Sequence, residues 1–377
     1  MPRTPLVEPG PPLTSAQVSR YSRHLLVPGM GMEAQRRLLN ARVAVVGAGG
    51  LGSPIVSYLA AAGTGHLTII DDDVIDATNL QRQVVHRHDD VGRRKADSAA
   101  EHVRGLNPDV SVEVRATRLT PGNARELLDG HDLVLDGADN FPTRYAVSDA
   151  CAALGIPVVW AAVLRFDAQI STFVPGAGEG VTLRDLFPVP PRPEDVPSCS
   201  EAGVLGALVG QVGSIMAGEA VKLLCGFGEP LVGRVLLVDA LSQRVREIPL
   251  RPAGAIVQPP AHEPVRELVP LVEVSAREVA EELDRPGPPV LLDVREPAEH
   301  ALGIVPGAMT VPVGEVLTWD ELIGQVPEGP VVVYCKTGPR ARRAAAHLVR
   351  IGHPDVRVMT GGMLAWVEHV DPSLPSY

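Results

Sequence analysis

Two stretches of this chain gather side chains that can act on phosphate groups. The first, at 71–83, reads DDDVIDATNLQRQ and supplies carboxylates, the amide of Asn79 and the cation of Arg82; Lys95 follows it. The second, at 133–140, is an apolar run that ends in Asp139 and Asn140. Cations and amides gathered in this way suit a triphosphate, whose charge must be clamped while a phosphorus atom is attacked.

The elements that must position these side chains can be predicted from periodicity. An apolar strand over 43–46 leads into GAGGLG at 47–52, which matches GxGxxG, and a helix-like stretch covers 53–62. The first two glycines of the pattern permit a tight turn, Gly52 lets helix and strand pack closely, and the helix N-terminus offers free N–H groups to phosphate. A second strand at 66–70 ends in Asp71, about 20 residues downstream, where a carboxylate can bind a ribose.

The run at 133–140 is predicted to be another buried parallel strand, which delivers Asp139 and Asn140 at its carboxyl end, where ligands of open α/β sheets bind. Asp139 is a candidate Mg²⁺ ligand, since Mg²⁺ takes few carboxylates together with phosphate oxygens. The sequence therefore predicts an α/β fold with a Rossmann-like ATP-binding domain and a mostly parallel sheet.

A nicotinamide or flavin site is the usual meaning of GxGxxG followed by a distal acid. Such sites need an open, largely apolar slot for the redox ring, whereas Asn79, Arg82 and Lys95 form a polar and cationic group. We therefore favour ATP. An NAD-linked oxidoreductase fused to a sulfur domain and a non-catalytic docking protein remain as alternatives.

Four segments together resemble the molybdopterin-synthase adenylyltransferase family, relatives of ubiquitin-activating enzymes. They are RYSRHLLVPGMGMEAQRRLLNARVAVVGAGGLG at 20–52, NLQRQ at 79–83, DGADN at 136–140 and PSCSEAGVLG at 197–206. The resemblance implies that ATP is used to adenylate the C-terminal glycine of a small ubiquitin-like sulfur-carrier protein ending in Gly-Gly. It also implies a homodimer in which Arg23 reaches the ATP of the partner subunit. The resemblance and the spacing together predict an ATP site made of Gly49, Gly50, Asp71, Thr78, Asn79, Leu80, Gln81, Arg82, Lys95, Asp139 and Asn140.

A second chemical motif lies near the C-terminus. A strand predicted at 331–334 enters Cys335-Lys-Thr-Gly-Pro-Arg340, and helical character follows at 341–351. Backbone amides of such a loop are expected to converge on the Cys335 sulfur; together with the helix N-terminus and Arg340 they are expected to lower the pKa of the thiol and favour an anionic sulfur. A cysteine phosphatase also uses a Cys-to-Arg loop, but its loop is one residue longer and normally follows a His, whereas position 334 is Tyr.

The segments LLDVREPAEH at 291–300, GIVPGAMTVP at 303–312, YCKTGPRA at 334–341 and GGMLAW at 361–366 resemble a single rhodanese domain. The resemblance implies that Cys335 carries sulfur as a persulfide. The donor would be thiosulfate or the persulfide of a cysteine desulfurase.

The other cysteines are Cys151, Cys199 and Cys225. Cys151 and Cys225 lie in apolar helical contexts and are expected in the core. The first resemblance suggests that Cys199 is an acyl-accepting or disulfide-resolving thiol. No CxxC pair is present, and Thr182 and Asp185 stand where many relatives carry the first pair, so we predict no structural zinc and other packing around 176–190.

Composition agrees with a multidomain globular enzyme. The 377 residues carry a net charge of −11, which argues against nucleic-acid binding. The apolar stretch at 203–218 is shorter than a membrane span and is expected to be a core helix. Its Gly206, Gly210, Ser214 and Gly218 fit close helix packing in a buried core or in a dimer interface. No signal peptide is visible, so a cytoplasmic protein without membrane contact is expected.

The predicted domains are a disordered N-terminus at 1–13, the adenylyltransferase domain at 14–250, a proline-rich linker at 251–269 and the rhodanese domain at 270–377. The sequence leaves open whether the carrier serves molybdopterin, thiamin, cysteine, tRNA thiolation or a natural product.

Overall fold

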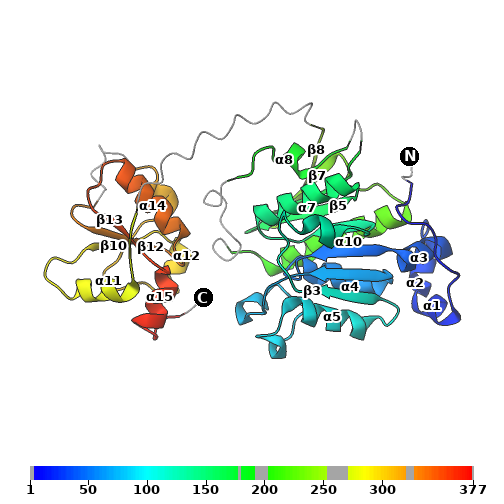
Figure 1. Ribbon diagram of the computed structural model, residues 1–377, viewed down its shortest axis with the longest axis horizontal. Helices are drawn as coiled ribbons and strands as arrows, with labels where there is room; N and C mark the ends of the chain where they lie inside the picture. The colour runs from blue at the N-terminus through cyan, green and yellow to red at the C-terminus, as the bar shows by residue number, and fades with distance from the viewer. Residues whose placement is uncertain (1–3, 177–179, 192–202, 253–270, 320–326, 376–377) are drawn as a thin grey trace. The chain divides into compact units, whose positions relative to one another are not determined.

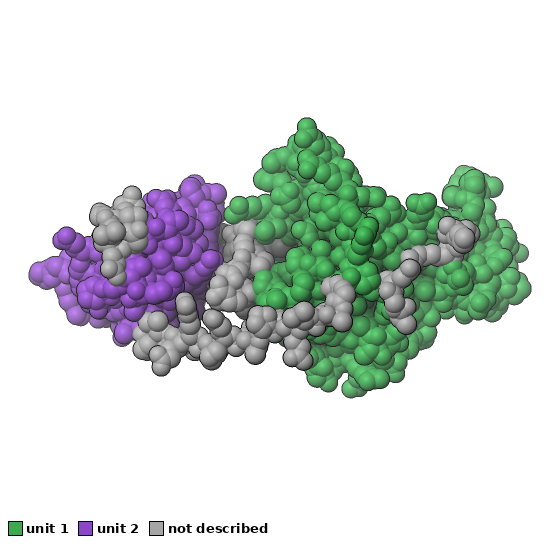
Figure 2. Space-filling model, turned by 90° about the horizontal axis from the view of Figure 1, so that it is seen from above, with its two compact units in different colours: residues 1–193, 197–259 green, residues 194–196, 260–377 purple. Residues whose placement is uncertain are grey.

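The computed structural model describes residues 4–176, 180–191, 203–252, 271–319 and 327–375. They form two compact units, which Figure 2 colours separately: the described residues up to 252 belong to the first and those from 271 onward to the second. Both units are α/β, as the sequence predicted. Most of the predicted linker and the whole PSCSE segment with Cys199 lie outside the described residues.

The first unit is built on one eight-stranded sheet with the order β3-β2-β1-β4-β5-β6-β7-β8. The pairs from β3 to β5 are parallel, and β6 to β8 continue the sheet antiparallel (Figure 1). The strands are β1 (Arg42–Val46), β2 (His66–Ile70), β3 (Ser111–Arg115), β4 (Leu133–Asp136), β5 (Val158–Leu164), β6 (Asp167–Phe173), β7 (Arg234–Asp239) and β8 (Arg244–Pro249).

The central strands β1, β2 and β4 are mostly apolar because both faces of the sheet are covered. In β1, Val43 and Val45 belong to the core on one face, whereas Ala44 and Val46 belong to the core on the other. The first core is formed with α3 (Gly31–Asn40), α4 (Gly52–Ala62), α5 (Lys95–Leu106) and α10 (Gly206–Cys225), and the second with α6 (Ala124–Leu128), α7 (Phe141–Leu154) and α8 (Leu183–Leu186). The short helices α1 (Ser15–Arg20) and α2 (Ser22–Leu25) precede α3, and the 3-10 turns η1 (Ala77–Asn79) and η2 (His88–Asp90) precede α5.

The turn from β1 into α4 has the close approach that the glycine pattern predicted. Gly47 has φ +88°, and a Cβ on Gly52 would lie 2.0 Å from the Gly47 carbonyl oxygen. Only glycine fits at position 52, and its lack of a side chain lets helix α4 begin in contact with the turn.

Helix α10 is long and apolar enough to cross a membrane by length and composition, but most of that apolar stretch is buried within this unit, as a core helix would be. The predicted close-packing stripe is only partly right. Gly210 and Gly218 have open space where a Cβ would be, whereas a Cβ on Gly213 would lie 2.4 Å from Pro54. The buried side of α10 is therefore set by its larger apolar residues, and one glycine outside the stripe permits the approach to α4.

Residues 4–13 differ from the predicted disorder. Val7 is buried in the first core, and the backbone N–H of Leu6 donates to the carbonyl of Leu223. Arg36 and Asn40 of α3 donate from their side chains to carbonyls of this segment. Its prolines keep it extended, and hydrogen bonds from α3 together with one apolar anchor hold it in place.

The segment around α8 is held by polar contacts instead of by cysteine pairs. The Asp185 carboxylate accepts from the backbone N–H of Thr182 at 2.7 Å and from its hydroxyl at 3.0 Å. Arg184 pairs with both oxygens of Asp149, and the Tyr145 hydroxyl donates to the Phe187 carbonyl at 2.6 Å. The two residues that stand where relatives carry cysteines thus form a capping box.

The second unit has a five-stranded parallel sheet with the order β11-β10-β12-β13-β9 (Figure 1). Its strands are β9 (Val272–Val274), β10 (Val290–Asp293), β11 (Met309–Thr310), β12 (Val331–Tyr334) and β13 (Val356–Met359). Helices α13 (Val313–Val316) and α14 (Pro339–Arg350) contribute to the core on one face, and α11 (Ala276–Leu283) and α15 (Gly362–His369) to that on the other. The remaining helix is α12 (Pro297–His300).

We expect Asp185→Ala to lower the free energy of unfolding by about 1 kcal/mol, because the Thr182 N–H and hydroxyl lose their acceptor. Glu126→Ala, which removes an exposed acid in the first turn of α6, is the control and should be close to neutral. A metal chelator should leave the unfolding midpoint of the unmodified protein unchanged. A midpoint that falls with chelator would show a structural metal and contradict the prediction of no zinc.

Candidate active sites

A cleft opens at the carboxyl ends of β1, β2 and β4 in the first unit. Its empty space is about 970 Å³, part of which is open to solvent. Seven of the eleven residues predicted to bind ATP line this cleft: Gly49, Gly50, Asp71, Arg82, Lys95, Asp139 and Asn140. The topology explains this, because the carboxyl ends of adjacent parallel strands meet at one edge of a sheet.

The other four predicted residues, at 78–81, shape the loop and are not among the residues that line the cleft. The side chains of Asp76 and Asn79 form a capping box around η1. Arg82 Nη1 donates to the Thr78 carbonyl at 3.2 Å. The motif is thus a turn that directs Arg82 into the cleft.

Asp71 holds the glycine-rich turn in addition to facing the cleft. Its Oδ2 accepts from the N–H of Ala48 at 2.7 Å, and its Oδ1 accepts from the N–H of Asp73 at 2.8 Å. Burial raises the pKa of Asp71, and the two amide donors and the Lys95 cation oppose that rise. This carboxylate is therefore part of the scaffold of the site as well as a candidate ribose ligand.

Lys95 lies in the first turn of α5 and is buried, with only its end directed to the cleft. Its Nζ pairs with Asp73 Oδ2 at 2.7 Å, and its backbone N–H donates to the Asp73 carbonyl. Arg118, at the other side of the cleft, pairs with Asp72 at 3.4 Å. The acidic run at 71–73 thus fixes two cations of the cleft.

Several residues at the cleft or beside it were not predicted from the sequence, among them Arg118, Gln83 and His86. Gln83 lines the cleft, is buried, and has a side-chain oxygen without a hydrogen-bond partner in the described structure. Gln83 is the last residue of NLQRQ at 79–83, and this motif is the sequence signal that could have indicated it. His86 is also buried; its Nε2 lies 2.9 Å from the Ala48 carbonyl and its Nδ1 lies 3.0 Å from Ser98 Oγ.

A carbonyl oxygen can only accept, so Nε2 of His86 carries a proton and donates to Ala48. The main chain of Ala48 is consequently held at two points, by Asp71 at its N–H and by His86 at its C=O. Burial lowers the pKa of His86, which favours the neutral ring. No sequence motif pointed to this role.

The segment DGADN carries two different carboxylates. Asp136, the last residue of β4, is fully buried, and burial raises its pKa from 3.8 to about 6. Asp139 is exposed at the cleft, and its Oδ1 accepts from Asn140 Nδ2 at 3.3 Å. Asn140 also caps α7 by accepting from the N–H of Thr143. An exposed carboxylate beside a phosphate-sized cleft fits a Mg²⁺ ion that keeps water and phosphate ligands.

Arg23 lies on α2, is exposed, and is not among the residues that line the cleft. Its segment is anchored by Tyr21, whose hydroxyl donates to Asp109 Oδ2 at 3.0 Å and accepts from Asn107 Nδ2 at 2.9 Å. Burial raises the pKa of Tyr21 to about 12. Arg23 is therefore an exposed residue two positions from a well-anchored tyrosine.

In the second unit, Cys335 follows β12 directly and is fully buried. Its Sγ accepts from the N–H of Gly338 at 3.1 Å, and its carbonyl accepts from the N–H of Met363 at the start of α15. The sequence predicted a strand, a loop and a helix in this order, and α14 begins at Pro339. One of the expected backbone amides thus reaches the sulfur.

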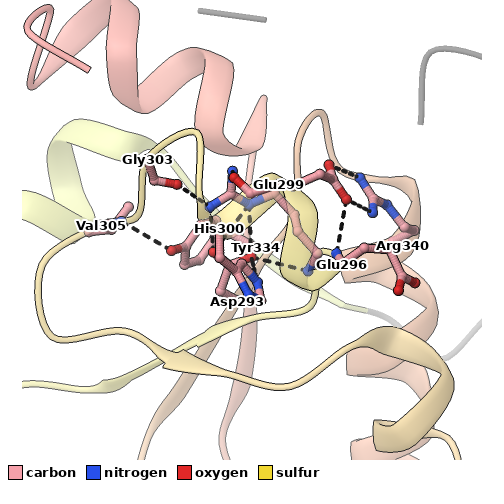
Figure 3. Close-up of polar contacts among 9 residues, drawn as sticks. Asp293, Glu296, Glu299, His300, Gly303, Val305, Tyr334 and Arg340 are labelled. Carbon is pink, nitrogen blue, oxygen red and sulfur yellow. Dashed lines mark hydrogen bonds and ion pairs between the residues drawn. The ribbon is translucent and has the colours of Figure 1, made fainter. Parts of the chain in front are cut away.

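Arg340, which is expected to help keep the Cys335 sulfur anionic, donates from Nη1 and Nη2 to the two oxygens of Glu299 at 2.5 and 2.8 Å (Figure 3). A planar guanidinium matches a carboxylate in two parallel bonds, which explains the preference for Glu299.

Cys151 and Cys225 are buried free thiols, as predicted for core residues. Burial raises the pKa of Cys225 to about 12 and that of Cys151 further. Neither thiol is suited to nucleophilic chemistry near neutral pH.

Comparisons with known proteins agree with this geometry. Residues 21–255 match the ThiF family, and residues 275–369 match the rhodanese-like domain. The chain is 42% identical over 392 residues to the probable adenylyltransferase/sulfurtransferase MoeZ of Mycobacterium tuberculosis, covering 99% of this chain and 98% of that protein. It is 52% identical over 239 residues to the SAMP-activating enzyme E1 of Haloferax volcanii, covering 63% of this chain and 87% of that protein. Among solved structures, MccB of E. coli with ATP is similar in fold, with a TM-score of 0.53 at 22% identity over 62% of this chain and 72% of that one.

We expect Asp136→Asn to change how stability depends on pH. The folded pKa of about 6 lies above the unfolded value of 3.8, so stability from this carboxyl is present below pH 3.8 and is lost as pH rises through 6. The loss is at most about 3 kcal/mol. The variant, whose amide oxygen can still accept from Ala138, should lose less unfolding free energy than the unmodified protein between pH 4 and pH 7. Denaturant unfolding at both pH values measures this, with exposed Asp89→Asn as control; equal losses in all three proteins would contradict it.

Proposed function

We propose that this chain, which belongs to the ThiF family and carries a rhodanese-like domain, is a bifunctional adenylyltransferase and sulfurtransferase. Its substrate is a small ubiquitin-like sulfur-carrier protein ending in Gly-Gly, and its product is the carrier's C-terminal thiocarboxylate. One observation carries the proposal: a polar phosphate-binding cleft and a cysteine loop lie in one chain that matches an adenylyltransferase/sulfurtransferase along its length.

In the first step the carrier carboxylate attacks the α-phosphorus of ATP, which gives an acyl-adenylate and releases pyrophosphate. The turn at Gly49 and Gly50 and the cations of Arg82 and Lys95 are placed to bind the phosphates, and Asp71 to bind the ribose. Gln83 offers an unsatisfied side-chain oxygen to the nucleotide. A nicotinamide ring would instead require an apolar slot, and these cations do not provide one.

Mg²⁺ bound through Asp139 would neutralise charge on the phosphate oxygens. The exposed carboxylate of Asp139 at the cleft supports this role, and Asn140 orients it by hydrogen bonding.

In the second step the Cys335 thiolate takes the outer sulfur from a donor. Thiosulfate would leave as sulfite, and a cysteine desulfurase persulfide would leave as a thiolate. The Cys335 persulfide then attacks the activated carbonyl, AMP leaves, and an acyl disulfide forms. A second thiolate, for which Cys199 is the candidate, attacks the Cys335 sulfur, releases the thiocarboxylate and leaves a protein disulfide that a cellular dithiol must reduce.

We also propose a homodimer in which Arg23 acts on the ATP of the partner subunit. Its exposed position on α2, outside the lining of its own cleft, supports action in trans. We place the enzyme in the cytoplasm.

Cys335→Ser should abolish thiocarboxylate formation and leave carrier-dependent pyrophosphate release within about twofold, because the two reactions use different sites. Intact mass spectrometry of the carrier, incubated with ATP, Mg²⁺ and thiosulfate, reports the exchange of one oxygen for sulfur. If pyrophosphate release falls together with thiocarboxylate formation, the division between the sites is wrong.

Mixing Arg23→Ala with Lys95→Ala should restore pyrophosphate release although each variant alone is inactive. With random subunit exchange, half of the dimers are mixed and each contains one complete site, so about a quarter of full activity is expected. Subunit exchange is verified by native mass spectrometry of differently tagged subunits, because either variant mixed with the unmodified protein gives half of full activity with or without exchange. Unrestored activity despite proven exchange would show that Arg23 does not act across the dimer.

A further inference from the structure

Glu299 links the α12 segment to the cysteine loop of the second unit. Both of its carboxylate oxygens accept from Arg340, and its Oε2 also accepts from the backbone N–H of Glu296 (Figure 3). The side chains of Glu299 and Arg340 are only 10% and 11% exposed. A bidentate pair at this burial fixes the guanidinium in one orientation.

The residues around the main chain of Glu299 are held by an ion pair and by hydrogen bonds. Asp293 and Arg295 form an ion pair with no exposure, at 2.6 Å between Oδ2 and Nη2. Arg295 donates to the carbonyls of Glu299 and Gly303, and the Tyr334 hydroxyl accepts from the N–H of Val305. Figure 3 shows these groups gathered around the short α12 turn. The main chain that carries Glu299 thus has little freedom to move.

The other end of the contact is the cysteine loop. Arg340 is in the first turn of α14, directly after the loop residues that include Gly338, whose N–H donates to the Cys335 sulfur. Tyr334, which precedes Cys335, belongs to the same network as Asp293. The loop is therefore attached to the α12 network before Cys335 through Tyr334 and after it through Arg340.

We propose that Glu299 is a positioning residue for sulfur transfer, which holds Arg340 and thereby fixes the conformation and local charge of the 335–340 loop. This inference rests on the proposed sulfur-carrying role of Cys335. Glu299 acts through Arg340, to which both of its carboxylate oxygens are bonded.

The test compares full-length Glu299→Gln, Arg340→Gln and the double variant. We expect Glu299→Gln to slow formation of the Cys335 persulfide from thiosulfate between about tenfold and a hundredfold, because a released arginine no longer fixes the loop. Adding Glu299→Gln to Arg340→Gln should change the rate less than twofold, since the residue through which Glu299 acts is already absent. Glu299→Asp, which keeps the charge, should recover part of the rate.

A pH profile separates positioning from mere stability. Alkylation of Cys335 should reach half of its maximal rate at lower pH in Glu299→Gln and at higher pH in Arg340→Gln, with the double variant close to the unmodified protein. Glu273→Gln is the matched control, because Glu273 pairs with Arg342 on the same helix at an exposed site and should change neither measurement.

The proposal is overturned if Glu299→Gln slows persulfide formation equally with and without Arg340, or if it lowers the unfolding midpoint while both the rate and the pH profile stay unchanged. Should the single variant fail to fold, the double variant, which leaves no buried charge unpaired, and Glu299→Asp still decide the question. Cys335→Ser is carried in parallel: persistent thiocarboxylate formation in that variant would refute the proposed function independently of Glu299.

Discussion

The turn between β1 and α4 depends on a contact that no side chain can enter. A Cβ on Gly52 would lie 2.0 Å from the carbonyl oxygen of Gly47, so the start of the helix and the end of the strand share one small space. This approach aims the N–H groups of the turn into the cleft. Because Asp71 accepts from the N–H of Ala48 and His86 donates to its C=O, the turn is held in place without a nucleotide. The positions of Arg82, Lys95 and Asp139 matter only relative to this fixed turn.

In both units, cationic side chains are paired with neighbouring carboxylates. At the cleft, Lys95 forms an ion pair with Asp73, and Arg118 forms one with Asp72. The sulfur domain pairs Arg340 with Glu299 and Arg295 with Asp293. A buried charge is costly unless it is paired and hydrogen-bonded, so the largely buried side chains of Lys95, Arg295 and Arg340 are each paired with a carboxylate. The functional groups are consequently ordered by electrostatics as well as by packing.

The segment around α8 illustrates how polar contacts order a short turn. It has a Thr182–Asp185 capping box and an Arg184–Asp149 pair. Hydrogen bonds of this kind contribute less than a metal centre, but they order a short turn that also packs on the second core through Leu183.

The sequence by itself determined the two α/β units and the position of the cleft, since periodicity predicts strands at 43–46, at 66–70 and from 133 onward, and the carboxyl ends of adjacent parallel strands meet at one edge of a sheet. It also determined that Cys335 lies between a strand and a helix. Tertiary structure alone decided the partners: His86 on Ala48, Glu299 on Arg340, Gly213 against Pro54, and residues 4–13 against α3. The reason is physical. Local periodicity reports which face of an element is buried, whereas a contact between residues 38 or 41 positions apart depends on how separate elements pack, and a single sequence carries no local signal for it.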